Sequence, residues 1–213
     1  MKIEILSDTF VTSVDFLKVF FCLKYLMSFQ LQMKIKPVAL SVSGYFFIMM
    51  IFHHVPWLGF FSPATYFPFI FLLLILQGMA FSFKNILLSG LIYLLVCQID
   101  NFIDSLLELI FPGISYQYIR LLTALISFVT VWLLCQLAQS RKFRIEEADH
   151  TSFILTQFIF TVLNFTLTGT TENILDASPS PFYANALNFT ASALSMIIGF
   201  TGFLLFFLLQ SNR

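Results

Sequence analysis

Runs of apolar residues, separated by short polar breaks, fill almost the whole chain. A helix needs about 20 predominantly apolar residues to cross roughly 30 Å of hydrocarbon, and most of the runs approach that length. The pattern predicts seven membrane-spanning helices, at residues 10–33, 38–55, 65–83, 86–108, 117–139, 152–170 and 184–209. Most prolines fall in or beside the breaks, where a missing N–H does not interrupt a helix.

The composition excludes a water-soluble fold. Of the 213 residues, 59% are hydrophobic and 10% are charged, against roughly 45–50% apolar and about 25% charged in a soluble domain. A chain of this length cannot bury so much apolar surface in its own core, so lipid has to cover the rest. The expected fold is all-α, a polytopic transmembrane helix bundle that forms one domain over residues 1–213. The expected location is a bacterial cytoplasmic membrane, with the lipid bilayer as a partner.

The positions of Lys and Arg predict the orientation of the bundle. Every second boundary between the apolar runs is basic, with Lys34, Lys36, Lys84, Arg141, Lys142, Arg144 and Arg213. The other boundaries are acidic, and Arg120 is their only base. Because basic loops are retained in the cytoplasm, the C-terminus is expected inside. The basic residues form no patch, so nucleic acid is not expected as a partner.

The first apolar run leaves the number of helices open between seven and six. It contains Asp15, Lys18 and Lys24, each of which is costly inside a membrane. If the run spans, the N-terminus lies outside; if it lies along the inner surface, six helices remain. Lys24 projects about 180° from Asp15 on a helical wheel, so the polar face of an interfacial helix is missing. We favour seven helices, with Asp15 and Lys18 paired on one face.

Three carboxylates form a stripe at the outer end of the fourth predicted helix. Asp100, Asp104 and Glu108 recur every four residues and share one helix face. Like charges at this spacing repel each other, so something should compensate for keeping them together. Two interpretations stay open: a stripe that faces a ligand or attracts a cation, and a solvated helix edge that pairs with Arg120.

Further candidate ligand-binding residues are His53, His54, Trp57 and Tyr66, around the second outer break. Adjacent histidines point about 100° apart and are poor joint ligands for a metal, and the three cysteines lack metal-binding spacing. No protease or other catalytic motif appears in the sequence. We therefore expect no enzyme activity, no metal and no cofactor.

The last predicted helix has one face of small and polar residues. Asn188, Ala191, Ser195, Gly199 and Gly202 lie on this face, and Leu194, Ile197, Leu204 and Leu208 lie opposite. In lipid, small residues let two helix backbones approach closely, so the small face should pack on another helix. Its partner is either a helix of the same chain or the same helix in a second protomer of a homodimer.

The order of these features resembles the membrane domain of AgrC-like bacterial sensor histidine kinases, which carry a GHKL-type ATPase region. The segments that carry the resemblance are KIKP, FKNILLSGLIYLL, IDNFIDSLLE, SRKFR and the terminal QSNR. The resemblance implies a quorum-sensing receptor of a two-component system, which binds an extracellular signal, typically a small peptide, and drives a cytoplasmic output. The family's kinase region is not found in these 213 residues.

Two other classes compete with a sensor. One is the substrate-binding membrane subunit of a transporter, such as the S-component of a vitamin importer, and the other is a structural subunit of a membrane assembly. Ionisable residues are nearly absent from five of the predicted helices, which argues against ion-coupled transport. A sensor that binds a peptide or small molecule outside the cell is the favoured interpretation.

Overall fold

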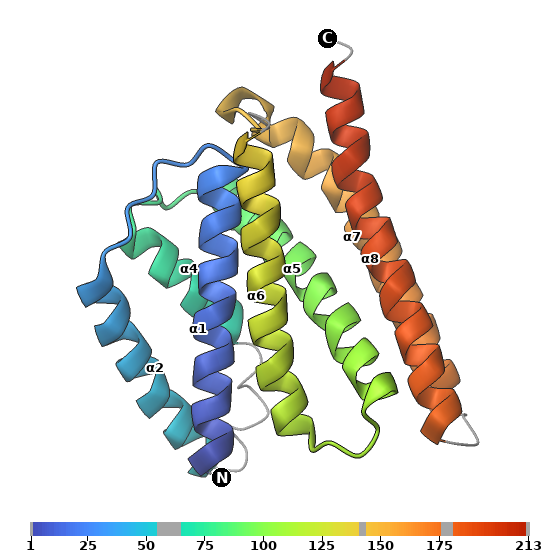
Figure 1. The fold of residues 1–213 in the computed structure, drawn as a ribbon. Helices are drawn as coiled ribbons and strands as arrows, with labels where there is room; N and C mark the ends of the chain where they lie inside the picture. Colours follow the sequence, from blue (N-terminus) through green and yellow to red (C-terminus); the bar gives the residue numbers. More distant parts are fainter. Residues whose placement is uncertain (1, 55–64, 141–143, 176–180, 212–213) are drawn as a thin grey trace. The chain divides into compact units, whose positions relative to one another are not determined.

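A computed structural model of the protein describes residues 2–54, 65–140, 144–175 and 181–211. These residues form seven α-helices and one short 3-10 helix, and no strand occurs among them (Figure 1). The helices are α1 (Lys2–Tyr25), α2 (Ile35–His54), α4 (Tyr66–Leu76), α5 (Phe83–Ile110), α6 (Tyr116–Ser140), α7 (His150–Leu175) and α8 (Pro181–Ser211), and the 3-10 helix is Glu147–Asp149. The all-α prediction is confirmed for this part of the chain.

Within the described residues, three helices are long and apolar enough to cross a membrane: Phe83–Ile110, Tyr116–Ser140 and Ala184–Phe206. They match the predicted helices at 86–108, 117–139 and 184–209 within a few residues at each end. Two shorter apolar helices cover Ile35–Ile51 and Tyr66–Leu76. Pro37, Pro68 and Pro181 all lie in the first turn of their helices, where no N–H is needed for the helix ladder.

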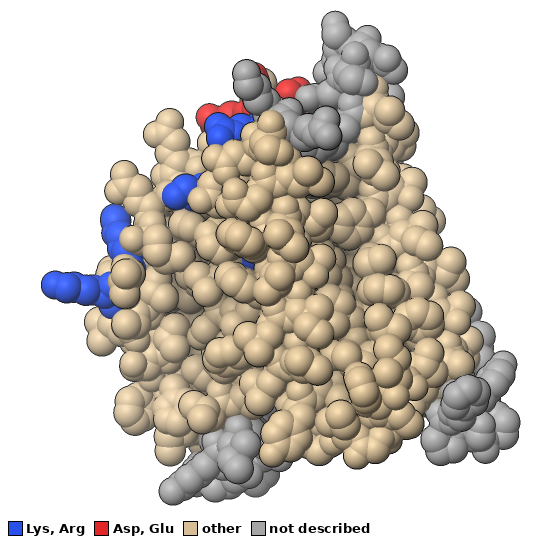
Figure 2. All heavy atoms as spheres, viewed as in Figure 1, with Lys and Arg blue, Asp and Glu red and all other residues tan. Residues whose placement is uncertain are grey.

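The chain divides into two compact units, and each is described by itself. The first unit comprises Met1–Tyr93 and Phe128–Ile145, and the second comprises Leu94–Ser127 and Glu146–Arg213. Figure 2 shows Lys and Arg atoms toward the upper left of the view, over the part of the first unit where α1 ends and α2 begins. Broad areas of the visible face carry no charged residue.

In the first unit, α1 packs against α2 and α4. The rings of Tyr45 in α2 and Phe69 in α4 stack with centroids 4.1 Å apart. Lys18 of α1 is fully buried, and its Nζ lies 2.7 Å from the Asp15 carboxylate. The predicted pairing of these two side chains is confirmed, and burial of the lysine makes the pairing necessary.

The prediction of a first helix over 10–33 is wrong at both ends, because α1 runs from Lys2 to Tyr25. The chain then turns at Ser28, whose φ is 57°, and continues without helix to residue 34. Met27 and Leu31 are nevertheless buried. Hydropathy registers burial from water rather than helix geometry, so it does not separate this buried loop from the helix before it.

Hydrogen bonds from other segments hold this loop. The N–H of Gln32 donates to the main-chain oxygen of Gln77 at 3.2 Å, and the N–H of Lys34 donates to the Gln77 side-chain oxygen. The N–H of Ile145 donates to the carbonyl of Leu26 at 2.7 Å. These bonds supply partners that a helix would otherwise provide.

The helix predicted over 65–83 is also wrong in extent, because α4 ends at Leu76 after 11 residues. At 1.5 Å per residue it covers only about 16 Å, roughly half the hydrocarbon thickness. The chain leaves the helix through Gly78, whose φ of +102° suits glycine and terminates the helix. In the sequence, the apolar residues after Gly78 concealed this stop.

In the second unit, α7 packs along α8. The predicted helix over 152–170 is too short, because α7 continues to Leu175. The predicted outer loop at 168–181 is therefore helical up to that residue, and residues 176–180 lie outside the described part. The polar run TGTTEN marks where hydrophobicity ends, and a helix can extend past that point into water.

Candidate functional site

The acidic stripe of α5 lies partly against α6. Asp100, Asp104 and Glu108 are all half-buried rather than fully exposed. The Thr123 hydroxyl of α6 donates a hydrogen bond to the Asp104 carboxylate at 3.0 Å. Arg120, one turn earlier in α6, attracts the same carboxylate. Contacts from α6 therefore offset part of the cost of burying the Asp104 carboxylate.

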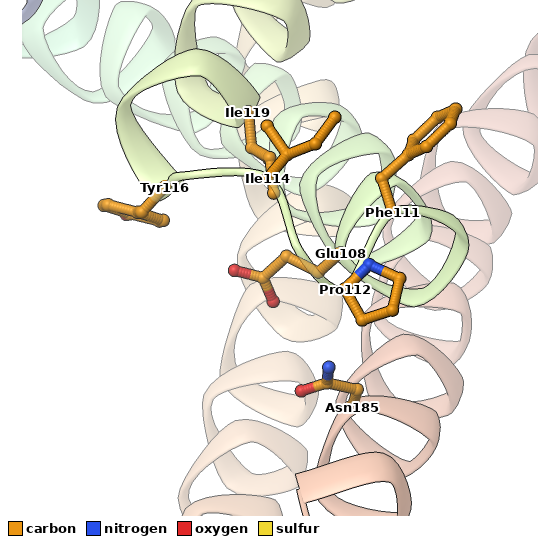
Figure 3. Close-up of a pocket in the computed structure, with 7 residues that line it drawn as sticks. All are labelled: Glu108, Phe111, Pro112, Ile114, Tyr116, Ile119 and Asn185. Atoms are coloured by element: carbon orange, nitrogen blue, oxygen red, sulfur yellow. The ribbon is translucent and has the colours of Figure 1, made fainter.

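A pocket of about 170 Å³ lies where α5 meets the start of α6 and the first turns of α8. Its walls are Phe111, Pro112, Ile114, Tyr116 and Ile119, and its polar groups come from Glu108 and Asn185. In Figure 3 the Glu108 carboxylate and the Asn185 amide point toward the same space from α5 and α8. Apolar walls with a few polar groups are the usual lining of a small-ligand site, and this pocket is smaller than the roughly 300–1,000 Å³ of most such sites.

The local sequence explains why the chain turns at this place. Pro112 cannot donate an N–H and restricts the residue before it, so α5 stops at Ile110. The turn closes through the N–H of Ile114, which donates to the carbonyl of Phe111 at 3.1 Å. The carbonyl of Ser115 then accepts the N–H of Tyr118 at 3.0 Å as α6 begins. This tight connection leaves apolar side chains around the Glu108 carboxylate.

Exposure of the apolar rim distinguishes the pocket mouth from its floor. Phe111, Ile114 and Tyr116 are 44%, 45% and 59% exposed, whereas Ile119 is 4% exposed. In Figure 3 the Tyr116 and Phe111 rings point away from the Glu108 carboxylate. The Arg120 guanidinium lies 5.8 Å from the Tyr116 ring centroid, so that ring already contacts a cation of α6.

Among the predicted ligand-binding residues whose side chains the structure describes, one lies at this pocket. Glu108 lines it, whereas Asp100 and Asp104 do not. Tyr66 begins α4 in the first unit, and His53 and His54 end α2 there. The side chains of the two histidines, and all of Trp57, lie outside the described residues.

Sequence reasoning missed Asn185 and the apolar walls. The polar signal that it used was the repeat of carboxylates along one helix, and Asn185 is separated from them by two further helices. Among the described residues, no group of three or more His, Cys, Asp or Glu side chains could hold a metal ion.

The small face of α8 meets α5 and α7 of the same chain. The hydroxyls of Ser192 and Ser105 of α5 are 2.8 Å apart. From α7, the Asn164 amide donates to the carbonyl of Ser195 at 3.2 Å, and the Gln157 amide donates to the carbonyl of Gly199 at 3.3 Å. In lipid such side-chain bonds contribute about 0.6 kcal/mol each on average.

Gly199 and Gly202 make the closest of these approaches. A Cβ on Gly199 would lie 1.8 Å from the Gln98 side-chain oxygen, and one on Gly202 would lie 2.6 Å from the Phe160 ring. The partner of these glycines, left open by the sequence, is thus a helix of the same chain. Leu194, Ile197, Leu204 and Leu208, on the opposite face, are 45% to 61% exposed.

Comparisons with protein-family models, with curated proteins and with solved structures gave no match. The functional argument therefore rests on the geometry of this chain.

Proposed function

We propose that this protein is a membrane sensor domain that binds a ligand from outside the cell in the Glu108 and Asn185 pocket. The observation that carries the proposal is the position of this pocket, which joins the α5–α6 turn to the first turns of α8. A ligand that contacts both sides acts directly on α8, a helix of 31 residues. That length, about 46 Å, is enough to carry a displacement across the bilayer.

The proposed topology has seven crossings of a bacterial cytoplasmic membrane, with the N-terminus outside and the C-terminus in the cytoplasm. Basic residues at alternate boundaries support it. The hydrogen bonds that the N–H groups of Gln32 and Lys34 donate to Gln77, and that of Ile145 donates to Leu26, also support it. They place the end of α4 beside the first basic boundary, and the segment after α1 beside the third. The pocket, at the far end of α5 from Lys84, is then external.

The third crossing contains α4, which at 11 residues is too short to span the membrane by itself. Because Gln77 bonds to the loop before α2, α4 ends on the same side as α2 begins. Tyr45 lies halfway along α2, and its hydroxyl oxygen is 3.3 Å from the hydroxyl oxygen of Thr65. The start of α4 is thus level with the middle of α2, and α4 accounts for the inner half of the crossing.

The resemblance to AgrC-like sensors points to the same class, because it implies an external signal and a cytoplasmic output. It also implies that the signal is a small peptide. A pocket of about 170 Å³ holds one side chain or end group of such a peptide rather than the whole of it. An engineered cavity of about 150 Å³ holds a benzene molecule, which sets the scale.

Hydrogen–deuterium exchange on the full chain in lipid nanodiscs tests the proposal. Concentrated medium from cultures of the source cells serves as the ligand source. We expect slower exchange at residues 108–119 and 184–188 and altered exchange at the other end of α8, residues 204–211. The Asn185→Leu variant should lose both effects. Asn101→Leu, at an exposed position of α5 outside the pocket, should retain them. Exchange that changes only elsewhere, or not at all, contradicts the proposal.

Reporter fusions test the topology separately. A reporter after Arg213 or within 140–150 should be cytoplasmic, and one at 176–180 should be external. The expectation follows from the distribution of Lys and Arg. A cytoplasmic reporter at 176–180 would place the pocket on the cytoplasmic side and contradict the proposal of an external ligand.

A further inference from the structure

The Glu108 carboxylate differs from that of Asp104, one turn earlier, in having no hydrogen bond or ion pair from the described residues. Asp104 accepts the Thr123 hydrogen bond and lies near Arg120. Among the described residues, Glu108 makes no hydrogen bond or ion pair, and no Lys, Arg or His lines its pocket. A half-buried carboxylate in apolar surroundings is normally paired, because burial removes part of its hydration.

The position of Glu108 makes its charge less favourable still. It lies in the last turn of α5, where the free carbonyls give the helix end a partial negative charge. Asp104 stands one turn before it, and like charges at this spacing repel. The helix end and Glu108 itself therefore give the pocket a negative potential, to which Asp104 adds only in part because Arg120 offsets some of its charge. Such a site concentrates cations.

On this basis we propose that the pocket recognises a ligand cation, an ammonium or guanidinium group carried on an apolar body. This inference rests on the proposed function and adds the chemical class of the ligand. The Glu108 carboxylate accepts N–H bonds from the cation. The Asn185 amide, which faces the same space (Figure 3), accepts another through its oxygen. The apolar body lies against Pro112, Ile114 and Ile119.

The volume of the pocket and its exposed rim further restrict which ligands can fit. About 170 Å³ accommodates a group the size of one amino-acid side chain. The exposed apolar rim of Phe111 and Ile114 suits a ligand that continues outward with more apolar surface. Two sources share this chemistry: a free small amine and a cationic residue or N-terminus of an apolar peptide.

Binding of matched probes to the full chain in nanodiscs tests the ligand class. The probes are phenethylammonium and its neutral isostere 2-phenylethanol, measured by ligand-observed NMR titration. We expect the ammonium compound to bind at least about tenfold more tightly, which corresponds to about 1.4 kcal/mol. In Glu108→Gln the ratio should fall to about 1, because the neutral amide keeps the shape and removes the charge.

The matched control is Asp100→Asn, which removes the same charge from the same helix outside the pocket. It should keep most of the preference for the ammonium probe. Unchanged circular dichroism and unfolding midpoints for both variants establish that they fold. A preference that survives Glu108→Gln, or falls equally in both variants, overturns the inference.

A peptide pair separates the two sources. An acetylated, amidated pentapeptide with one Lys among Ala and Leu is compared with the same peptide carrying norleucine. If the Lys peptide binds more tightly than the norleucine peptide and competes with phenethylammonium, the cation belongs to a peptide residue. If only phenethylammonium binds, the ligand is a free amine. Equal binding of 2-phenylethanol and phenethylammonium leaves the pocket as a binding site and overturns only its cation selectivity. Binding of neither overturns the ligand class, while the exchange experiment decides the sensor proposal independently.

Discussion

At the residue scale, α1 holds the fully buried Lys18 side chain beside the Asp15 carboxylate. The spacing of Asp15 and Lys18 predicts that they can meet, and they do, at 2.7 Å. It does not predict that Lys18 is fully buried while the Asp15 side chain stays 13% exposed. Burial arises from the packing of α1 against its neighbouring helices, which no local pattern encodes.

Removing the lysine from this pair should destabilise the protein strongly. In Lys18→Met the Asp15 carboxylate loses its ammonium partner in a largely dehydrated place, at an expected cost of about 3–5 kcal/mol. The double variant Asp15→Asn, Lys18→Met should recover most of that loss, because it leaves no carboxylate behind. Denaturant unfolding in mixed micelles measures the free energies.

The control for this prediction is Lys24→Met on the same helix. Lys24 is half-exposed, and its Nζ lies 5.7 Å from the ring centroids of Phe20 and Tyr25. Such contacts contribute only about 0.5–1 kcal/mol at exposed sites, so the loss should be small. Equal losses of unfolding free energy for Lys18→Met and Lys24→Met would show that the ion pair does not contribute more to stability than an exposed lysine.

At the element scale, hydropathy succeeded where a helix stays in one environment along its length. The described bounds of α5, α6 and α8 agree closely with 86–108, 117–139 and 184–209. It failed where a helix and an apolar run end at different places. The loop after Tyr25 remains apolar because Met27 and Leu31 are buried, and α7 continues as helix through polar residues. Backbone partners and burial, set by tertiary contacts, decide such boundaries.

The close approach of α8 to α5 predicts a large difference between two glycines. In Gly199→Ala the new methyl group meets the amide end of the Gln98 side chain, which must move within the packed helix interface, at an expected cost of about 1 kcal/mol. In Gly44→Ala of α2 the methyl group meets nothing within 4 Å. That change should be neutral or stabilise by up to about 1 kcal/mol. The unfolding midpoints of the two variants, measured side by side, test this difference, and a Gly199→Ala as harmless as Gly44→Ala would contradict the expected cost of moving Gln98.

The loop after α1 should depend on Gln77. This side chain is 1% exposed, and its oxygen accepts the N–H of Lys34. Gln77→Met keeps the volume and removes the acceptor, so we expect a loss of about 1 kcal/mol in stability. Faster proteolysis between residues 26 and 34 should accompany it. Gln136→Met, at an exposed position of α6, should change neither property.

At the scale of the whole molecule, the candidate site shows what one sequence can and cannot predict. The acidic stripe correctly drew attention to the end of α5, where Glu108 lines a pocket. Asn185 could not be found in this way, because its approach to Glu108 depends on how α8 folds back along α7 and α5. Local patterns report what a helix carries, and long-range packing decides which of those residues meet.

The last prediction concerns the side on which the chain begins. The bond between Ile145 and Leu26 puts the ends of α1 and α6 on one side of the first unit, and Phe21 and Phe128 pack with ring centroids 5.9 Å apart. The two helices therefore run parallel, and α1, at 24 residues or about 36 Å, is long enough to cross the bilayer. If residues 140–150 are cytoplasmic, an epitope tag ahead of Met1 should be reached by antibody in intact spheroplasts. A cysteine in Gln30→Cys should react with an impermeant maleimide only after permeabilisation, whereas one in Ser115→Cys should react at once. A tag that is protected until permeabilisation would mean that α1 does not cross, which leaves six helices and an inner N-terminus.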